Sequence, residues 1–103
     1  MTKHTLKLND RYFDAVANGI KTFEIRKDDR GFRVGDTLKL YRVGVDGKYM
    51  TDLTVEGKRL TEDEPSSFAN RVEVKVKYIL THDDFPDGIP EEYVVMSIEK
   101  VGE

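Results

Sequence analysis

The sequence contains no cysteine, and this absence excludes two classes of site. Without thiols the chain can form neither a disulfide framework nor a thiolate zinc centre. The only two histidines are His4 and His82, and the acidic residues that follow His82 are more typical of a solvated loop than of a hard-metal site. The sequence therefore predicts no metal site and no cofactor.

Long apolar runs are also missing. No segment approaches the roughly 20 apolar residues that a membrane-spanning helix needs, and the opening Met-Thr-Lys-His lacks the apolar stretch of a signal peptide. We therefore expect a cytoplasmic protein with no membrane partner. The 103 residues include no long polar linker, which predicts one domain over residues 1–103 and leaves the oligomeric state open.

A uniform excess of positive charge is absent as well. The net charge is −3, but residues 20–48 carry eight basic and five acidic side chains, whereas residues 49–103 carry six basic and thirteen acidic ones. This distribution disfavours indiscriminate DNA binding. It leaves two interpretations: a local basic site beside an acidic remainder, or mixed charge that only keeps a small domain in solution.

What the sequence does contain is a series of short segments in which polar and apolar residues alternate, as in half-buried strands. The predicted strands cover residues 4–8, 22–26, 37–43, 72–80 and 93–99, with a weaker strand over 48–55. Asp46-Gly47 predicts a hairpin turn before the weaker strand. Residues 56–70 are rich in Gly, Pro, Ser and acidic side chains, which indicates a loop or insertion.

One short helix is predicted after the first strand, with Asn9 as its N-cap and Asn18-Gly19 at its end. His4, in the strand before it, is expected at the surface. One helix cannot cover both faces of five or six strands, so we expect the strands to curl into a small barrel. The predicted fold class is mixed α+β, mainly β. The expected core residues are Val74, Val76, Met96 and Ile98, and the strand over 72–80 alternates Val72, Val74, Val76, Tyr78 and Leu80 with charged residues.

The densest polar cluster follows the predicted helix. Glu24 and Arg26 are two residues apart on a strand, so they project from one face about 7 Å apart. Thr22 shares that face, and Lys21 lies at the mouth of the strand. Arginine and lysine suit a phosphate, and a glutamate can accept from an exocyclic amine or act as a base. The simpler interpretation is a solvated strand face on which acid and base neutralise each other.

Nearby residues extend this candidate site. Asp29 and Arg30 could rim it or pair with each other. Phe32 and Tyr49 could stack on a base, as aromatic residues in barrel clefts do, although core packing is an equal alternative for Phe32. Asp36 is expected to order a turn rather than contact a ligand. Arg30 and Phe32 complete the predicted ligand-binding set.

The pattern Gly19-x-Lys21-Thr22-x-Glu24-x-Arg26, with the later Gly35-Asp36, strongly resembles the ASCH-like domains of the PUA superfamily. It is most similar to a branch of short bacterial and phage proteins of unknown function. The likeness extends over most of the chain apart from about residues 44–70. It implies a PUA-like β-barrel of five or six strands with one principal helix. It also implies a cleft beside that helix, lined by Lys21, Glu24 and Arg26, that binds RNA or a nucleotide.

The resemblance leaves an enzymatic alternative open. Some short ASCH proteins resemble amidohydrolases that remove an acyl group from a modified cytidine, using a Lys, a Thr hydroxyl and a separate Glu. This chain keeps Lys21 and Thr22, but Glu24 stands where those enzymes carry the nucleophilic Thr, and a carboxylate cannot replace that hydroxyl without a different mechanism. Glu24 could instead activate a water while Lys21 stabilises the oxyanion. A third alternative is a protein-interaction module without a small ligand, suggested by the acidic C-terminal half.

Overall fold

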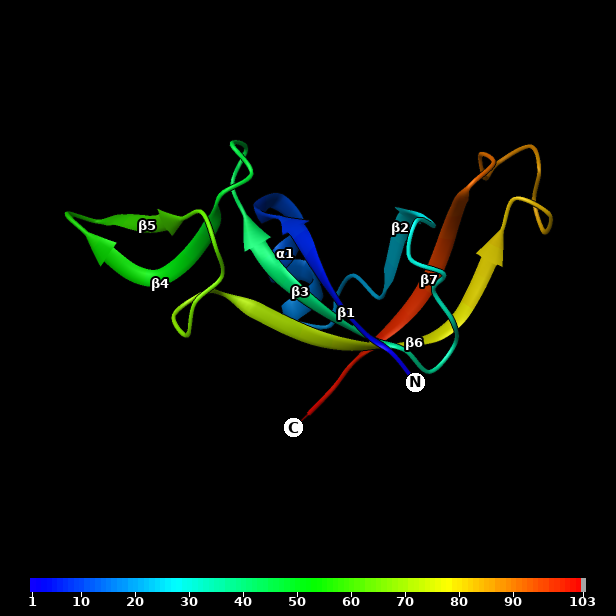
Figure 1. Ribbon diagram of the computed structural model, residues 1–103, viewed down its shortest axis with the longest axis horizontal. Coiled ribbons are helices and arrows are strands. Elements are labelled where there is room, and N and C mark those ends of the chain that lie inside the picture. The colour runs from blue at the N-terminus through cyan, green and yellow to red at the C-terminus, as the bar shows by residue number, and fades with distance from the viewer. Residues whose placement is uncertain (103) are drawn as a thin grey trace.

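The strands of this chain form one strongly curled sheet, with a single helix against it (Figure 1). The computed structural model describes residues 1–102, and these residues form seven strands and one helix. The elements are β1 (Lys3–Asn9), α1 (Asp10–Ala17), β2 (Phe23–Lys27), β3 (Thr37–Val43), β4 (Tyr49–Val55), β5 (Lys58–Glu62), β6 (Arg71–Thr81) and β7 (Tyr93–Lys100). The mainly β class with one short helix is therefore confirmed.

The order of the strands places β1 and β2 at free edges of the curl. The sheet runs β2-β7-β6-β3-β4-β5, and β1 pairs in parallel with β3, with Lys3 opposite Thr37 and Asn9 opposite Val43. The other pairs are antiparallel. Within residues 1–102, β1 has only β3 as a partner strand and β2 has only β7. The curl therefore stops short of a closed barrel, and the edges of β1 and β2 bound the gap.

The core lies inside the curl and beneath α1. Its residues come from alternate positions of β1, β3, β6 and β7, from the inner face of the helix and, for Phe32, from the loop before β3, and they include the four predicted core residues. The cluster contains Leu6, Leu8, Phe13, Val16, Phe32, Leu38, Leu40, Val72, Val74, Val76, Val94, Met96 and Ile98. Inward side chains from the strands and the helix meet in a single apolar layer, which the curl of the sheet encloses.

The helix begins and ends where the sequence predicts. The Asn9 side chain accepts a hydrogen bond from the Arg11 amide at 2.9 Å, which satisfies one free N–H of the first turn. Beyond the helix, Gly19 has φ of +73°, a conformation in which a Cβ atom would be strained. Within the described residues no helix has the length and apolar character needed to cross a membrane.

The apolar pattern of β6 does not stay on one face, which corrects the expectation of simple alternation over residues 72–80. The register of β6 against β7 shifts between Val76 and Tyr78, as at a β-bulge. The extra residue reverses the direction of every later side chain. Tyr78 is consequently 62% exposed, and Ile79 takes the inward position against the core.

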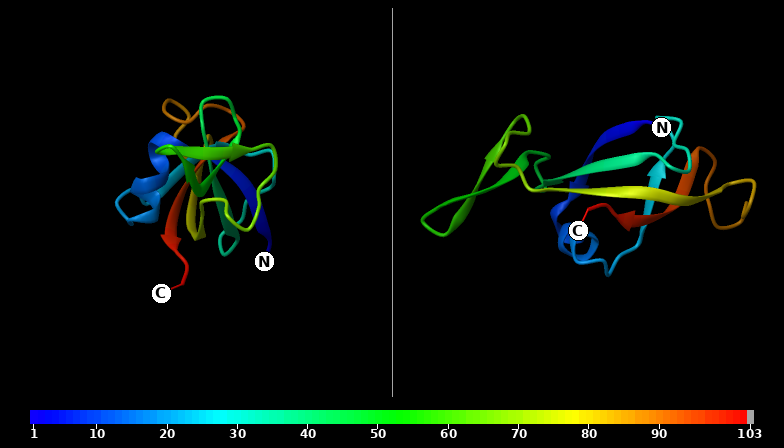
Figure 2. Two further views of the ribbon diagram at one scale, coloured as in Figure 1. Left: turned by 90° about the vertical axis from the view of Figure 1, so that its left-hand side faces the viewer. Right: turned by 90° about the horizontal axis from the view of Figure 1, so that it is seen from below.

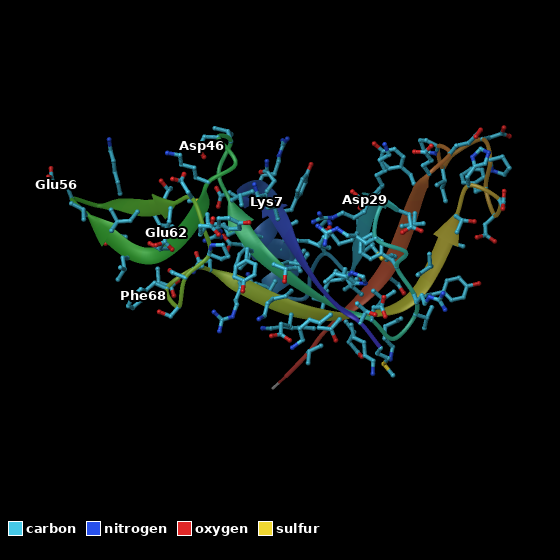
Figure 3. The ribbon with its side chains drawn as sticks, in the orientation of Figure 1. Lys7, Asp29, Asp46, Glu56, Glu62 and Phe68 are labelled. Carbon is cyan, nitrogen blue, oxygen red and sulfur yellow. The ribbon has the colours of Figure 1, made fainter. Side chains whose placement is uncertain are left out.

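Two further expectations were wrong. Residues 56–70 are not simply a loop, because β5 lies within them and forms a hairpin with β4 that extends from the body (Figure 1; Figure 2). Glu56 and Gly57, with φ of 52° and 79°, make its turn, and Figure 3 shows Glu56 at the far tip. His4 is buried rather than exposed, with its Nε2 2.8 Å from Oδ2 of Asp36.

Asp36 orders the loop before β3, as expected. Its carboxylate accepts hydrogen bonds from His4 and from the backbone amides of Thr2 and Arg33. Burial raises the pKa of Asp36, but these hydrogen bonds outweigh the burial and hold its pKa below the ordinary value. The His4 ring also packs edge-on against Phe32, so this buried pair joins the start of β1 to the loop that enters β3.

Candidate nucleic-acid interface: a basic cleft at the open edge of the sheet

A cleft of about 520 Å³ lies where β2 and its flanking residues face β1 and the first turn of α1. Its charged lining is mostly basic, with one acid, Glu24, among the cations Lys7, Lys21, Arg26 and Lys27. Three aromatic residues also line it: Tyr12, Phe23 and Tyr93. The cleft combines positive charge with aromatic surface, as grooves that hold single-stranded nucleic acid do.

The predicted trio of Lys21, Glu24 and Arg26 meets in this cleft. The Lys21 ammonium lies 2.7 Å from Oε1 of Glu24, and Nε of Arg26 lies 2.9 Å from Oε2. Glu24 is only 3% exposed, so both oxygens of a buried carboxylate are held by a separate cation. Lys21 also donates to the carbonyl oxygen of Phe23 at 2.7 Å, which fixes its side chain over the start of β2.

The burial of Glu24 follows from the pairing of β2 with β7. Glu24 lies opposite Met96 and Arg26 lies opposite Val94, and both β7 residues are buried in the core. Because directly opposed residues share a face of the sheet, the side chains of Glu24 and Arg26 point inward. Phe23 and Ile25 point outward and are 46% and 58% exposed. This arrangement reverses the usual distribution of polar and apolar residues on a strand, which is the kind of exception that indicates function.

Two arginines bridge the gap between β2 and β1. Nη2 of Arg26 donates to the carbonyl oxygen of Lys7 at 2.6 Å, and Nη1 of Arg30 donates to that of Thr5 at 3.3 Å. Both carbonyls belong to the edge of β1 that has no partner strand among the described residues. The two arginine side chains thus bond to carbonyls that a neighbouring strand would otherwise bond. Because no strand within residues 1–102 pairs with this edge of β1, the cleft stays open.

Aromatic rings surround the ammonium groups. The Lys21 ammonium lies 5.4 Å from the ring centre of Tyr12 and 4.7 Å from that of Phe23. The Lys7 ammonium lies 5.4 Å from the ring centre of Tyr49, at the base of the β4–β5 hairpin. These distances fit cation–π contacts, so the cations are held beside flat apolar surfaces.

The other predicted site residues are placed differently. Thr22 is exposed and does not line the cleft; its carbonyl oxygen accepts from the Ile98 amide at 3.0 Å and so continues the edge of β2. Phe32 packs in the core and also lines a hollow beside the cleft. Arg30 lies in a neighbouring hollow together with Tyr49.

Sequence reasoning missed most of the other lining residues, and the charged or aromatic ones among them include Lys7, Lys27 and Tyr12. Lys7 lies on β1 and Tyr12 on α1, and only the curl of the sheet brings them to β2. Lys7 is a polar residue of an alternating strand, which indicates only that its side chain is outside the core. Tyr12 is an exposed residue of its helix, and nothing in the sequence pattern links it to a ligand.

The loop before β7 lines a separate hollow of about 310 Å³, whose charged lining is acidic apart from His82. His82 is tied to its own loop, with Nδ1 2.6 Å from the carbonyl oxygen of Ile89. Across residues 1–102, no group of three or more His, Asp or Glu side chains is arranged to hold a metal ion.

Comparison with known proteins places this architecture in a family. A curated relative, the "Uncharacterized 12.9 kDa protein in GpA 3'region" of Escherichia phage P2, is 50% identical over 38 residues. That alignment covers 37% of this chain and 35% of the phage protein, so it spans about a third of the relative's length. A family described as "Domain of unknown function (DUF3850)" matches residues 3–98, a range that includes every residue of the cleft, and the chain belongs to that family.

Proposed function

We propose that the cleft binds a nucleotide, either free or within an RNA strand. The observation that supports this most is the nearly inaccessible carboxylate of Glu24, held between Lys21 and Arg26 at the base of a basic cleft. Buried ion pairs of this kind are often no better for stability than apolar residues of the same volume. Their presence at the gap between β1 and β2 is better explained by a charged ligand.

The cleft offers suitable groups for each part of a nucleotide. Lys7, Lys27 and Arg26 supply cationic donors for a phosphate. The Arg26 guanidinium has five N–H donors, and the hydrogen bonds to Glu24 and Lys7 use only Nε and one donor of Nη2. Glu24, which is only 3% exposed, holds the Lys21 and Arg26 cations in place for the ligand. Tyr12 presents an exposed ring on which a base can stack.

The resemblance of residues 19–26 to ASCH-like domains supports the same assignment. RNA or nucleotide binding is the usual proposal for those domains, and the Lys, Glu and Arg of their motif correspond to the three residues that meet here. We propose that the family shares the ancestry of the PUA superfamily.

Hydrolysis of an acylated nucleoside fits the geometry less well. Thr22, the hydroxyl of the motif, is outside the cleft, and both oxygens of Glu24 are already engaged by cations. The 3% exposure of Glu24 leaves little access for a water that it would activate. Binding by the cations needs no such access, so we treat hydrolysis as an outcome of the test below.

The test is isothermal titration calorimetry of the wild-type chain against nucleoside monophosphates and short RNAs at two salt concentrations. We expect Lys21→Ala and Glu24→Ala to weaken binding at least tenfold, and the wild-type affinity to fall as salt increases. Lys58→Ala, which removes an exposed lysine on β5 outside the cleft, is the matched control and should stay within twofold of wild type.

Two results would reject the proposal. One is binding that neither cleft substitution alters, and the other is no binding of any nucleotide up to millimolar concentration. Release of a free acid from acylated nucleosides that depends on Glu24 would replace the binding proposal with the hydrolase.

A further inference from the structure

A second hollow of about 370 Å³ adjoins the cleft and shares three of its basic residues, Lys7, Arg26 and Lys27. Its own lining adds Arg30 and the ring of Tyr49, and its one acid is Asp29. In Figure 3 the labelled Lys7 and Asp29 lie on the same side of the molecule. The two hollows therefore form one continuous basic surface, and the Arg26 guanidinium belongs to both.

The two arginines are spaced regularly along β1. Arg26 donates to the carbonyl of Lys7 and Arg30 to that of Thr5, and these carbonyls are two residues apart on one strand. Two residues of a parallel strand span about 7 Å. This distance is of the order of the step between successive phosphates along an extended single strand. Two guanidinium groups are thus placed to contact neighbouring phosphates.

Each hollow also has an aromatic ring at its edge. Tyr12 lines the first and Tyr49 lines the second. The Tyr49 ring is held by an edge-to-face contact with the buried Tyr41, with ring centres 5.9 Å apart and an interplanar angle of 87°. A ring fixed in this way is a ready surface for a base, because stacking on it costs little side-chain freedom.

We infer that the two hollows are successive subsites for one single-stranded oligonucleotide. This inference rests on the proposed function and deepens it: the ligand has at least two nucleotides, it crosses Arg26, and its second nucleotide contacts Arg30 and Tyr49. A free mononucleotide would use the first hollow alone and would leave Arg30 and the Tyr49 ring without a role.

The test compares nucleoside monophosphates with 5′-phosphorylated dinucleotides and tetranucleotides, each as RNA and as DNA, by calorimetry. Arg30→Ala and Tyr49→Leu probe the second hollow, and Tyr49→Phe retains a ring. The matched controls are Arg33→Ala and Tyr78→Ala, whose side chains are exposed and line neither hollow.

We expect dinucleotides to bind at least tenfold more tightly than monophosphates. Arg30→Ala and Tyr49→Leu should each weaken dinucleotide binding about 5- to 50-fold, the range expected for loss of a base stack or a charged contact, and leave monophosphate binding within twofold. Tyr49→Phe and the two controls should match wild type, whereas Lys21→Ala should weaken both classes. A preference for RNA or for DNA would identify which strand the site takes, and either preference supports the inference.

Three results would overturn it. If dinucleotides bind no more tightly than monophosphates while Lys21→Ala still weakens both, the second subsite is wrong and the proposed function stands. If dinucleotides bind more tightly but are insensitive to Arg30→Ala and Tyr49→Leu, the second nucleotide lies elsewhere. If neither class binds, both proposals fail.

Discussion

Replacement of Glu24 by glutamine tests whether the ion cluster of Lys21, Glu24 and Arg26 stabilises the fold or lowers its stability. Glu24→Gln keeps the shape of the side chain and removes its charge, so Lys21 and Arg26 lose their shared counter-ion. The side chains of these two cations are only 17% and 22% exposed, so water can solvate them only in part. The variant should therefore leave two poorly compensated positive charges beside the core.

The expected loss follows from these exposures. Removal of one partner from a fully buried ion pair costs about 3–5 kcal/mol. Partial hydration of both cations and the remaining amide oxygen of glutamine reduce this cost, so we expect the free energy of unfolding to fall by about 2–3 kcal/mol. Domains of this size are stable by about 5–15 kcal/mol, so the variant should still fold, with a Tm lower by roughly 10–20 °C.

The measurement is urea unfolding followed by far-ultraviolet circular dichroism, since the chain has no tryptophan to report by fluorescence. An unchanged m-value would show that the folded and unfolded states keep their difference in exposed surface. A triple variant, Lys21→Met, Glu24→Leu and Arg26→Met, provides the comparison. Because apolar residues of similar volume often replace buried ion clusters without loss, it should lie within about 1 kcal/mol of wild type and bind no nucleotide.

Two outcomes would refute this reasoning. A loss below about 0.5 kcal/mol in Glu24→Gln would mean that the carboxylate is not desolvated in the way the geometry indicates. A triple variant less stable than Glu24→Gln would mean that the charges hold the fold together. Stability alone would then explain the buried charges, and they would give no reason to infer a ligand.

Two further predictions concern stability. Burial raises the pKa of Asp36, but hydrogen bonds from His4 and two backbone amides hold this pKa below 3.8. The Asp36 carboxylate therefore stabilises the fold above pH 3.8, and this contribution is lost as the pH falls through the lowered folded-state pKa. Asp36→Asn should flatten the acid limb of the unfolding free energy, measured between pH 7 and pH 2, and an acid limb identical to wild type would contradict this. In Gly57→Ala the new Cβ meets no atom within 4 Å, but it is placed on a residue with φ of +79°. The variant should therefore lower the free energy of unfolding by about 1 kcal/mol and speed amide exchange in β4 and β5. Faster exchange in β6 and β7 instead would contradict the view that Gly57→Ala strains only the β4–β5 hairpin.

Local patterns predicted much of the fold because the forces behind them are local. The caps of α1 depend on Asn9 at its start and on Asn18 and Gly19 at its end, and the inward face of β7 follows from strict alternation. The meeting of Glu24 and Arg26 was predictable for the same reason, since residues two apart on a strand share a face.

The remaining features depend on contacts between distant segments. Lys7 and Tyr12 reach the cleft only because the sheet curls β1 towards β2. The outward turn of Tyr78 follows from a bulge in the pairing with β7, which alternation in one strand cannot reveal. His4 is buried because it finds a carboxylate 32 residues away in the chain. In each case the deciding partner lies outside the window in which periodicity is read.

The gap between β1 and β2 and the charges of β2 have a common physical cause. If the two edges paired directly, Glu24 and Arg26 would be enclosed in a closed barrel, and removal of ions from water costs several kcal/mol for each ion. Inward charges on an edge strand therefore oppose pairing, as they do where proteins protect free edges. The carbonyls of Thr5 and Lys7 then need other donors, and Arg30 and Arg26 provide them.

Removal of the charges on β2 should therefore close the gap between β1 and β2. In a β-strand the N–H of a residue points to the same side as its own carbonyl, so the amides of Thr5 and Lys7 face the gap. In the triple variant, amide hydrogen exchange at these two positions should slow, because β1 and β2 no longer have charges to keep hydrated and can form backbone hydrogen bonds. Exchange at Leu6, which faces β3, is the internal control and should stay the same. Unchanged exchange at Thr5 and Lys7 in a folded triple variant would show that the path of the chain, rather than the charge on β2, holds the cleft open.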